Sequence, residues 1–519
     1  MAGEGLPAGG EELEKLEKGT SGEVTASSSD GDGAQPAAAP PPPSQRRGQA
    51  APPSLGRTLT RSTSLKKAEA MLPKARQGTV FSATAHIVTA VIGSGVLALP
   101  YAVAVMGWVA GPILVLLCAW VTLFTSLLLA DCFAVQGKIH RTYSGCVGAV
   151  FGRTGFHISA WLQHVSLILY SLAYTIVAAQ SLQTVARSVC EQHNTSSCFD
   201  AFWQWALVFG GIQLVLGQLP SLHYFAGIST VGAFMSLTYS ATSIGVAAGN
   251  LGKLPYGSGT VGGLQLGSQV DKAFDILNSL GAILFSFNIS LILIEVQDTL
   301  RHPANSAHGG LDADVVAEAR GPIRKMRKAV YISMALMTVI YMAVACFGYA
   351  CLGDSTPFNI LTGPYGEGWQ PAQVPRWVIN MANVAVFLRT VPAYQIYSIP
   401  FLCLVEEQLE GWHRWPTWLT GLTLRLLWRS AFVAVITFVA CLMPFFQVIT
   451  GLVGAISFAP ITAIFPIELW IRSKRPSRRV RLGLRSLSAL AVLVTLATTA
   501  GSLQRLFTSW SDFQLFGTN

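Results

Sequence analysis

The sequence has little charge for its length. Asp, Glu, Lys and Arg make up 12% of 519 residues, whereas hydrophobic residues make up 51%. Soluble domains are roughly 25% charged, so this deficit indicates a membrane protein. The net charge of +9 does not require a nucleic-acid partner, and none is expected, because the basic residues of membrane proteins collect on cytoplasmic loops.

Motifs for catalysis are also missing. The nine cysteines include no Cys-x-x-Cys pair, so no zinc or redox signature is present. No nucleophile–base motif, nucleotide loop or metal-ligand cluster is found, so no enzyme, catalytic residue or metal is predicted. No cleavable signal peptide is expected either, because the acidic, small-residue-rich start lacks an early apolar run.

Residues 1–75 have a low-complexity composition that cannot bury enough apolar surface to fold. We expect a disordered cytoplasmic tail, with a basic end that suits the anionic inner leaflet. Thr60 and Ser64 each follow an arginine by three positions and are predicted phosphorylation sites. An ordinary solvated tail is the alternative interpretation.

Eleven apolar runs of spanning length follow, and they place a transmembrane domain at residues 76–505 and a short C-terminal tail at 506–519. The runs are 80–104, 108–133, 158–187, 202–219, 222–247, 272–298, 327–352, 377–403, 424–444, 446–470 and 482–505. The run 158–187 is long for one span and is expected to be tilted or to extend beyond the lipid.

Loop charges set the topology. With a cytoplasmic N-terminus, the loops after spans two, six and ten lie inside and carry most of the basic loop residues, as the positive-inside rule requires. The loop after span three then lies outside, where a disulfide and a glycan form. That loop predicts a Cys190–Cys198 disulfide and glycosylation at Asn194. The outward sequon favours the plasma membrane, although a vacuolar or endosomal lumen would look the same.

Two spans are interrupted at mid-depth. The first carries Gly93-Ser94-Gly95, and the sixth carries Ser286, Asn288 and Ser290 inside an apolar run. Irregular backbone at membrane depth is tolerated where it lines a cavity or is buried in protein, and polar residues there usually face a bundle interior. Broken spans five apart are typical of a transporter with an inverted repeat. For the glycines, a small-residue helix contact is the alternative.

Motifs along the chain resemble the amino acid/auxin permease family, and especially its amino acid permease branch. They are AHIVTAVIGSGVLALPYA, LLLADC, SLILIEVQDTL, CFGYACLGD, AYQIYSIPF, and MPFF through FPIELW. The resemblance covers about residues 76–505. It implies an all-α integral membrane protein with the leucine-transporter inverted-repeat fold, broken helices 1 and 6, and proton-coupled import of amino acids.

By this resemblance, two groups of residues bind the substrate. The carboxylate site falls on Ile92, Gly93, Ser94 and Gly95, where a break frees amides at a half-helix N-terminus. The amino-group site is carried over to Phe285, Ser286 and Asn288, where a break frees carbonyls for the ammonium. Phe285 and Phe287 either shape the side-chain pocket or simply pack in the core.

Four ionisable residues are candidates for coupling or gating. His86 lies seven residues before Gly93, about 10 Å along the same helix face, and its imidazole titrates near neutrality. Asp131 and Glu295 lie at inner span ends, where pairing with bases would gate the cytoplasmic side. Arg389, near the middle of span eight, departs from the family. Three roles are open for it: a buried pair with a carboxylate, a fixed cation in place of sodium, or a counter-ion for an acidic substrate.

The sequence therefore predicts a secondary active transporter for proton-coupled amino acid symport by alternating access. It needs no cofactor, since the proton is the coupling ion, and its partners are the amino acid and membrane lipid. The alternatives are a carrier of another small acid such as auxin or GABA, an exchanger, or an amino acid sensor of the same fold.

Overall fold

A computed structural model describes residues 78–193, 199, 201–219, 225–253, 259–264, 267–300, 312–361, 374–410 and 421–511. Thr60, Ser64, Asn194 and Cys198 lie outside these residues, so the predictions made for them stay predictions. Cys190 is disulfide-bonded.

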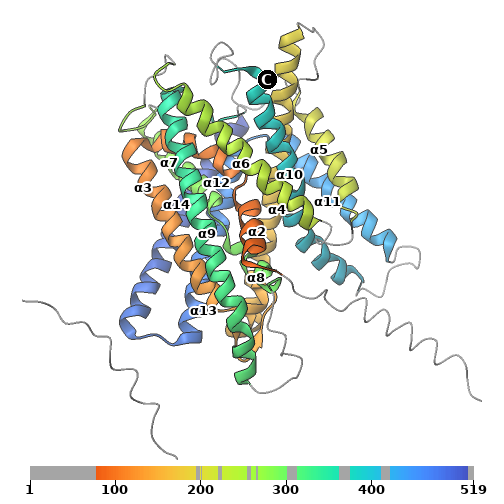
Figure 1. Ribbon diagram of the computed structural model, residues 1–519, viewed down its shortest axis with the longest axis vertical. Coiled ribbons are helices and arrows are strands. Elements are labelled where there is room, and N and C mark those ends of the chain that lie inside the picture. The colour runs from red at the N-terminus through yellow and green to blue at the C-terminus, as the bar shows by residue number, and fades with distance from the viewer. Residues whose placement is uncertain are drawn as a thin grey trace, which may run out of the picture. The chain divides into compact units, whose positions relative to one another are not determined.

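Helices dominate the described part of the chain (Figure 1). A hairpin of two-residue strands, which turns at Gln136 and Gly137, and an isolated bridge between Gly78 and Leu300 depart from the all-helical expectation. The elements are α2 Val80–Val91, α3 Gly95–Asp131, β1 Ala134–Val135, β2 Lys138–Ile139, α4 Tyr143–His193, α5 Phe202–Leu216, α6 Phe225–Gly249, α7 Gln269–Ser286, α8 Ser290–Asp298, α9 Asp312–Leu352, the 3-10 turn Gly353–Ser355, α10 Arg376–Glu410, α11 Leu422–Leu442, α12 Phe446–Ser457, the π-helix Phe458–Ile464, α13 Phe465–Lys474 and α14 Arg478–Ser511.

Every predicted apolar run falls on one or more of these helices. Eight described stretches are long and apolar enough to cross a membrane by length and composition. The number differs from eleven because α3 contains parts of two predicted spans, α5 is short, and α10, which carries Arg389, is not among the eight. The run 446–470 is divided by the π-helix around Pro460, where proline cannot supply the amide of a regular turn.

Two glycines mark kinks that divide α3 and α4 into two helices each. Gly107 has φ +81° inside α3 and Gly152 has φ +70° inside α4, a region that L side chains rarely adopt. Gly107 divides the first predicted span from the second. The third span lies in the part of α4 that follows the Gly152 kink, and the last helix continues to Ser511, beyond the predicted boundary at 505.

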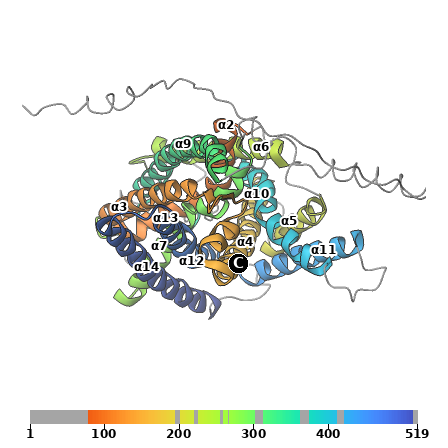
Figure 2. The ribbon, with the colours of Figure 1, turned by 90° about the horizontal axis from the view of Figure 1, so that it is seen from below.

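Helices α2, α7 and α12 pack on longer helices of the bundle. Helix α2 contacts α6 and α9, α4 packs on α10 and α12, and α7 packs on α3 and α12. Figure 2, seen from below, shows α14 along the outside next to α12 and α7. The largest fully buried side chains include two arginines and many tyrosines, which is unusual for a membrane core.

One of these arginines joins three helices. Arg429 on α11 forms an ion pair with Glu406 on α10, with Nε–Oε1 2.5 Å and Nη2–Oε2 3.2 Å. Its Nη1 donates to the carbonyls of Gly217 at 2.7 Å and Leu219 at 2.9 Å, just beyond α5. Because Arg429 is 1% exposed, these partners replace its water shell and fix the ends of α5 and α10.

Candidate functional site

The first break separates α2 from α3. Helix α2 ends at Val91, and the amide of Gly93 turns back to the carbonyl of Val91 at 2.6 Å. Helical bonding resumes when Val96 donates to Gly93 at 3.3 Å. Within the described residues, the amides of Ser94 and Gly95 have no hydrogen-bond partner, and neither has the buried Ser94 hydroxyl. The start of α3 therefore offers unpaired donors, as predicted from its glycines.

The second break separates α7 from α8. Irregular turns connect Leu284 to Ile289, and the Ser286 hydroxyl bonds back to Ala282 at 2.9 Å. The Asn288 amide donates to Ser457 at 2.8 Å and accepts from Thr462 at 2.9 Å. Asn288 thus connects the break to α12 and the π-helix, and both polar atoms of its side chain are hydrogen-bonded.

The two breaks lie against each other. A Cβ added to Gly95 would meet the Oγ of Ser286 and come within 3.0 Å of its Cα. The hydroxyl of Tyr341 on α9 lies 2.6 Å from the Val91 carbonyl and 3.1 Å from the Ser286 carbonyl. Residues almost 200 positions apart are therefore brought together, as the predicted site requires.

Tyrosines that the sequence analysis missed bond the carbonyls on both breaks. Tyr239 lies 2.9 Å from the Gly93 carbonyl, Tyr397 lies 3.2 Å from the Ala90 carbonyl, and Tyr170 lies 3.0 Å from the Phe285 carbonyl. The carbonyls expected to be free near Phe285 therefore already hold a hydroxyl partner. Tyr397 lies within the motif AYQIYSIPF, but no local sequence signal marks Tyr170 or Tyr239.

The two phenylalanines of the second break pack on these tyrosines. Phe285 stacks on Tyr170 with centroids 4.6 Å apart, and Phe287 meets Tyr341 edge-on at 5.1 Å. Both phenylalanines are buried. Core packing, one of the two interpretations of these residues, is observed.

Arg389 lies at the first break. It is 1% exposed, and its Nη2 donates to the carbonyls of Thr89 at 2.9 Å and Ala90 at 3.4 Å. Its guanidinium carbon lies 5.2 Å from the ring centre of Tyr174. A cation is favoured at a helix C-terminus and over an aromatic face, and both apply here.

A buried pair with a carboxylate, one of the three roles open for Arg389, is absent from the described residues, where its hydrogen bonds go to backbone carbonyls. Its Nε and Nη1 are buried and unpartnered there. A Cβ at Gly93 would come within 2.6 Å of Nη2 and 3.1 Å of Nη1. The charge therefore lies directly over the break.

The other three predicted ionisable residues lie on α2, α3 and α8. His86 on α2 is half-buried, and its imidazole forms no hydrogen bond to the described residues. Asp131 pairs with Arg327 on α9 at 3.5 Å. Glu295 accepts from the Tyr143 amide at 3.1 Å and from Gln163 at 3.0 Å, which ties α8 to α4.

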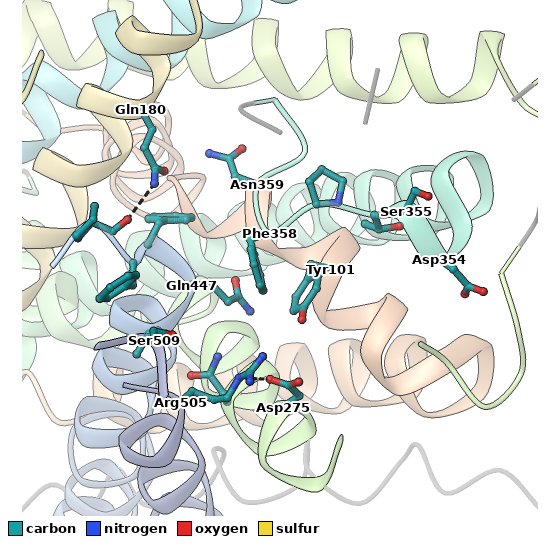
Figure 3. Close-up of a pocket in the computed structure, with 17 residues that line it drawn as sticks. Tyr101, Gln180, Asp275, Asp354, Ser355, Phe358, Asn359, Gln447, Arg505 and Ser509 are labelled. Atoms are coloured by element: carbon teal, nitrogen blue, oxygen red, sulfur yellow. Dashed lines mark hydrogen bonds and ion pairs between the residues drawn. The ribbon is translucent and has the colours of Figure 1, made fainter. Parts of the chain in front are cut away.

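A cavity of about 640 Å³ lies elsewhere in the domain (Figure 3). It is lined by α3, α4, α7, the start of α12 and α14, and by the segments that follow α9 and precede α12. Asp275 and Arg505 form an ion pair on its wall. None of the predicted substrate-binding residues lines it.

Comparisons with known proteins agree with the motifs. A family model described as transmembrane amino acid transporter protein matches residues 76–507. The chain is 34% identical to amino acid permease 2 of Arabidopsis thaliana over 457 residues, which cover 82% of this chain and 87% of the relative. It is also 34% identical to amino acid permease 4 of the same plant over 472 residues, or 85% and 96% of the two chains.

A solved structure of Mhp1, a nucleobase-cation-symport-1 family transporter in a closed conformation with bromovinylhydantoin bound, is also similar. It has a TM-score of 0.49 and 14% identity, with 85% of this chain and 95% of that chain covered. The predicted helical membrane fold with broken first and sixth spans is confirmed in the structure itself. The chain belongs to the family of transmembrane amino acid transporters, the amino acid/auxin permease family that its motifs resemble.

Proposed function

We propose that the protein imports amino acids by proton-coupled symport, with alternating access to a site at the two breaks. One observation carries the proposal: the unpaired amides of Ser94 and Gly95 belong to a break whose Gly95 lies in close contact with Ser286 of the second break. Amides at a helix N-terminus bind a carboxylate well, because the helix dipole adds to their hydrogen bonds.

The second break supplies acceptors for the substrate ammonium. The Phe285 and Ser286 carbonyls each hold a tyrosine hydroxyl. A carbonyl oxygen has two lone pairs, so it accepts a further hydrogen bond without losing the first. The ammonium then lies between these carbonyls while the carboxylate lies on the start of α3, and no cofactor is needed.

In this proposal Arg389 is the fixed cation of a sodium-independent carrier. Replacing it by leucine removes a charged donor from the Thr89 and Ala90 carbonyls, and such bonds contribute about 1.5–3 kcal/mol. We expect sodium-free uptake to fall at least about tenfold. Initial uptake rates in vesicles with and without sodium would measure this.

Arg389→Lys is the matched control, since it keeps the charge but loses the planar fork. Its uptake should lie between those of the wild type and Arg389→Leu. Undiminished sodium-free uptake by a folded Arg389→Leu variant would rule out the fixed cation. A loss confined to aspartate and glutamate would instead assign Arg389 to acidic substrates.

His86 carries the coupling proton in this proposal. His86→Ala should abolish accumulation driven by a proton gradient, because no imidazole remains on α2 near the first break to take up the proton. Exchange of labelled for unlabelled substrate at equal concentrations needs no gradient and should persist. The control is His157→Ala, which changes an exposed histidine on α4. Full proton-driven accumulation in His86→Ala would exclude the coupling role.

The decisive experiment for the function is uptake into proteoliposomes of the twenty common amino acids, with an inward proton gradient. Concentrative uptake that a protonophore abolishes and that ignores sodium would support the symporter. Uptake of auxin or GABA alone would favour a carrier of another small acid. Binding without flux in a folded preparation would favour a sensor.

We place the protein in the plasma membrane with its N-terminus in the cytoplasm. The support is the basic residues on the loops assigned to the inside and the sequon on the opposite side. Sensitivity of a tag at residue 1 to protease only after cell permeabilisation would support this orientation. Cleavage of the tag in intact cells would contradict it.

A further inference from the structure

The cavity that contains the Asp275–Arg505 pair has no role in the transport site described above. We propose that it is a second amino acid-binding site, which holds a zwitterion while another occupies the breaks. This inference rests on the proposed transport function. The cavity volume of about 640 Å³ lies within the roughly 300–1,000 Å³ typical of small-molecule sites.

Three residues that line this cavity carry buried polar atoms without hydrogen-bond partners among the described residues. The Oδ1 of Asn278, the Nδ2 of Asn359 and both amide atoms of Gln447 have no hydrogen-bond partner in the described part of the chain. All three side chains are less than 6% exposed. An unsatisfied buried polar group costs about 1–3 kcal/mol, so this group of donors and acceptors indicates a missing polar ligand.

The charges complete a site for a zwitterion. Asp275 on α7 and Arg505 on α14 are paired, with side chains 4% and 22% exposed. A guanidinium has five N–H donors, so Arg505 retains donors for a substrate carboxylate beside the Gln447 amide. The Asp275 carboxylate and the Asn278 oxygen accept from the ammonium, and Figure 3 shows Gln447, Arg505 and Asp275 around the same space.

The wall also has an apolar part for the amino acid side chain. The rings of Tyr101 and Phe358 are 4.4 Å apart and inclined at 52°. Both line the cavity, next to the polar groups in Figure 3. A site with a few placed polar groups and an aromatic wall is suited to an amino acid with an uncharged side chain.

The cavity and the breaks are separate places. Asn278 precedes Ser286 by eight residues of α7, which is about 12 Å along the helix. Between them, α7 and α12 meet at glycines: an added Cβ at Gly281 would meet backbone atoms of Gly451, and one at Gly454 would meet the backbone of Gly281. This backbone contact leaves both sites free to be occupied at once.

Binding stoichiometry of the full-length protein in lipid nanodiscs tests the proposal, with radiolabelled alanine, glutamine and aspartate as probes. We expect about two molecules of alanine or glutamine per wild-type chain and about one in Gln447→Leu. Since the Gln447 amide has no hydrogen bond to lose, the variant should fold normally. Gln504→Leu, which changes a glutamine on α14 that does not line the cavity, should keep two.

The outcomes separate the two proposals. One bound molecule in the wild type, lost in Gly95→Ala and kept in Gln447→Leu, would overturn the second site and leave transport intact; the cavity would then hold water only. Retention of two molecules in folded Gln447→Leu would also overturn it. No binding and no uptake of any probe would overturn the second site and the proposed function together.

Discussion

Replacing Gly95 by alanine is expected to reduce amino acid uptake at least about tenfold. The new methyl group would meet the Oγ of Ser286 and approach its Cα within 3.0 Å, so the two breaks must move apart. Overpacking of this kind costs about 1–3 kcal/mol, and each 1.4 kcal/mol is about a tenfold change. Because the contact joins the proposed carboxylate and ammonium subsites, the loss should appear in uptake of every substrate.

The matched control is Gly245→Ala on α6. A Cβ at Gly245 has no atom within 4 Å, so the same chemical change should leave uptake within about twofold and stabilise the helix by roughly 0.5–1 kcal/mol. Initial rates normalised to the amount of folded protein would compare the two. Equal activity of Gly95→Ala and Gly245→Ala would show that the breaks do not form the transport site.

Replacing Arg429 by methionine is expected to destabilise the fold by about 3–5 kcal/mol. The change leaves the Glu406 carboxylate without its guanidinium and removes the donors to Gly217 and Leu219. An unpaired charge in this position costs more than the lost pair itself contributes. Heating in detergent, followed by fluorescence-detected size exclusion, should show an apparent Tm lower by at least about 5 °C.

Two further variants identify the cause. Arg485→Met removes an exposed partner of Glu468 at 2.9 Å, and Glu468 keeps Arg472, so the loss should stay below about 1 kcal/mol. Adding Glu406→Met to Arg429→Met removes the stranded carboxylate and should recover part of the Tm. If Arg429→Met and Arg485→Met had the same apparent Tm, the buried ion pair would not hold α5, α10 and α11 in place.

The breaks could be predicted from the sequence because the signal is local. Gly93 and Gly95 inside one apolar run, and Ser286 and Asn288 inside another, show where helix propensity fails within a few residues. The position of Arg389 within a span could also be predicted, because a charge within an apolar run needs a special environment. Family motifs then supplied the fold, which the helices of the structure confirm.

The partners of these residues could not be predicted, because they come from distant parts of the chain. Arg389 was expected to have a carboxylate among its possible partners, but it donates to carbonyls of α2, 300 residues away. Tyrosines at 170, 239 and 341 look like ordinary apolar residues in a hydropathy pattern, although their hydroxyls bond the breaks. Asp275 and Arg505 meet only after α7 and α14 pack together.

Tyr341 has one hydroxyl proton and two carbonyls to serve, Val91 on one broken span and Ser286 on the other. A full hydrogen bond to one carbonyl therefore weakens the bond to the other. If the Ser286 carbonyl moves away from Tyr341, the hydroxyl donates fully to Val91, and the end of α2 is held more tightly. The positions of the two broken spans are thus linked through a single shared proton.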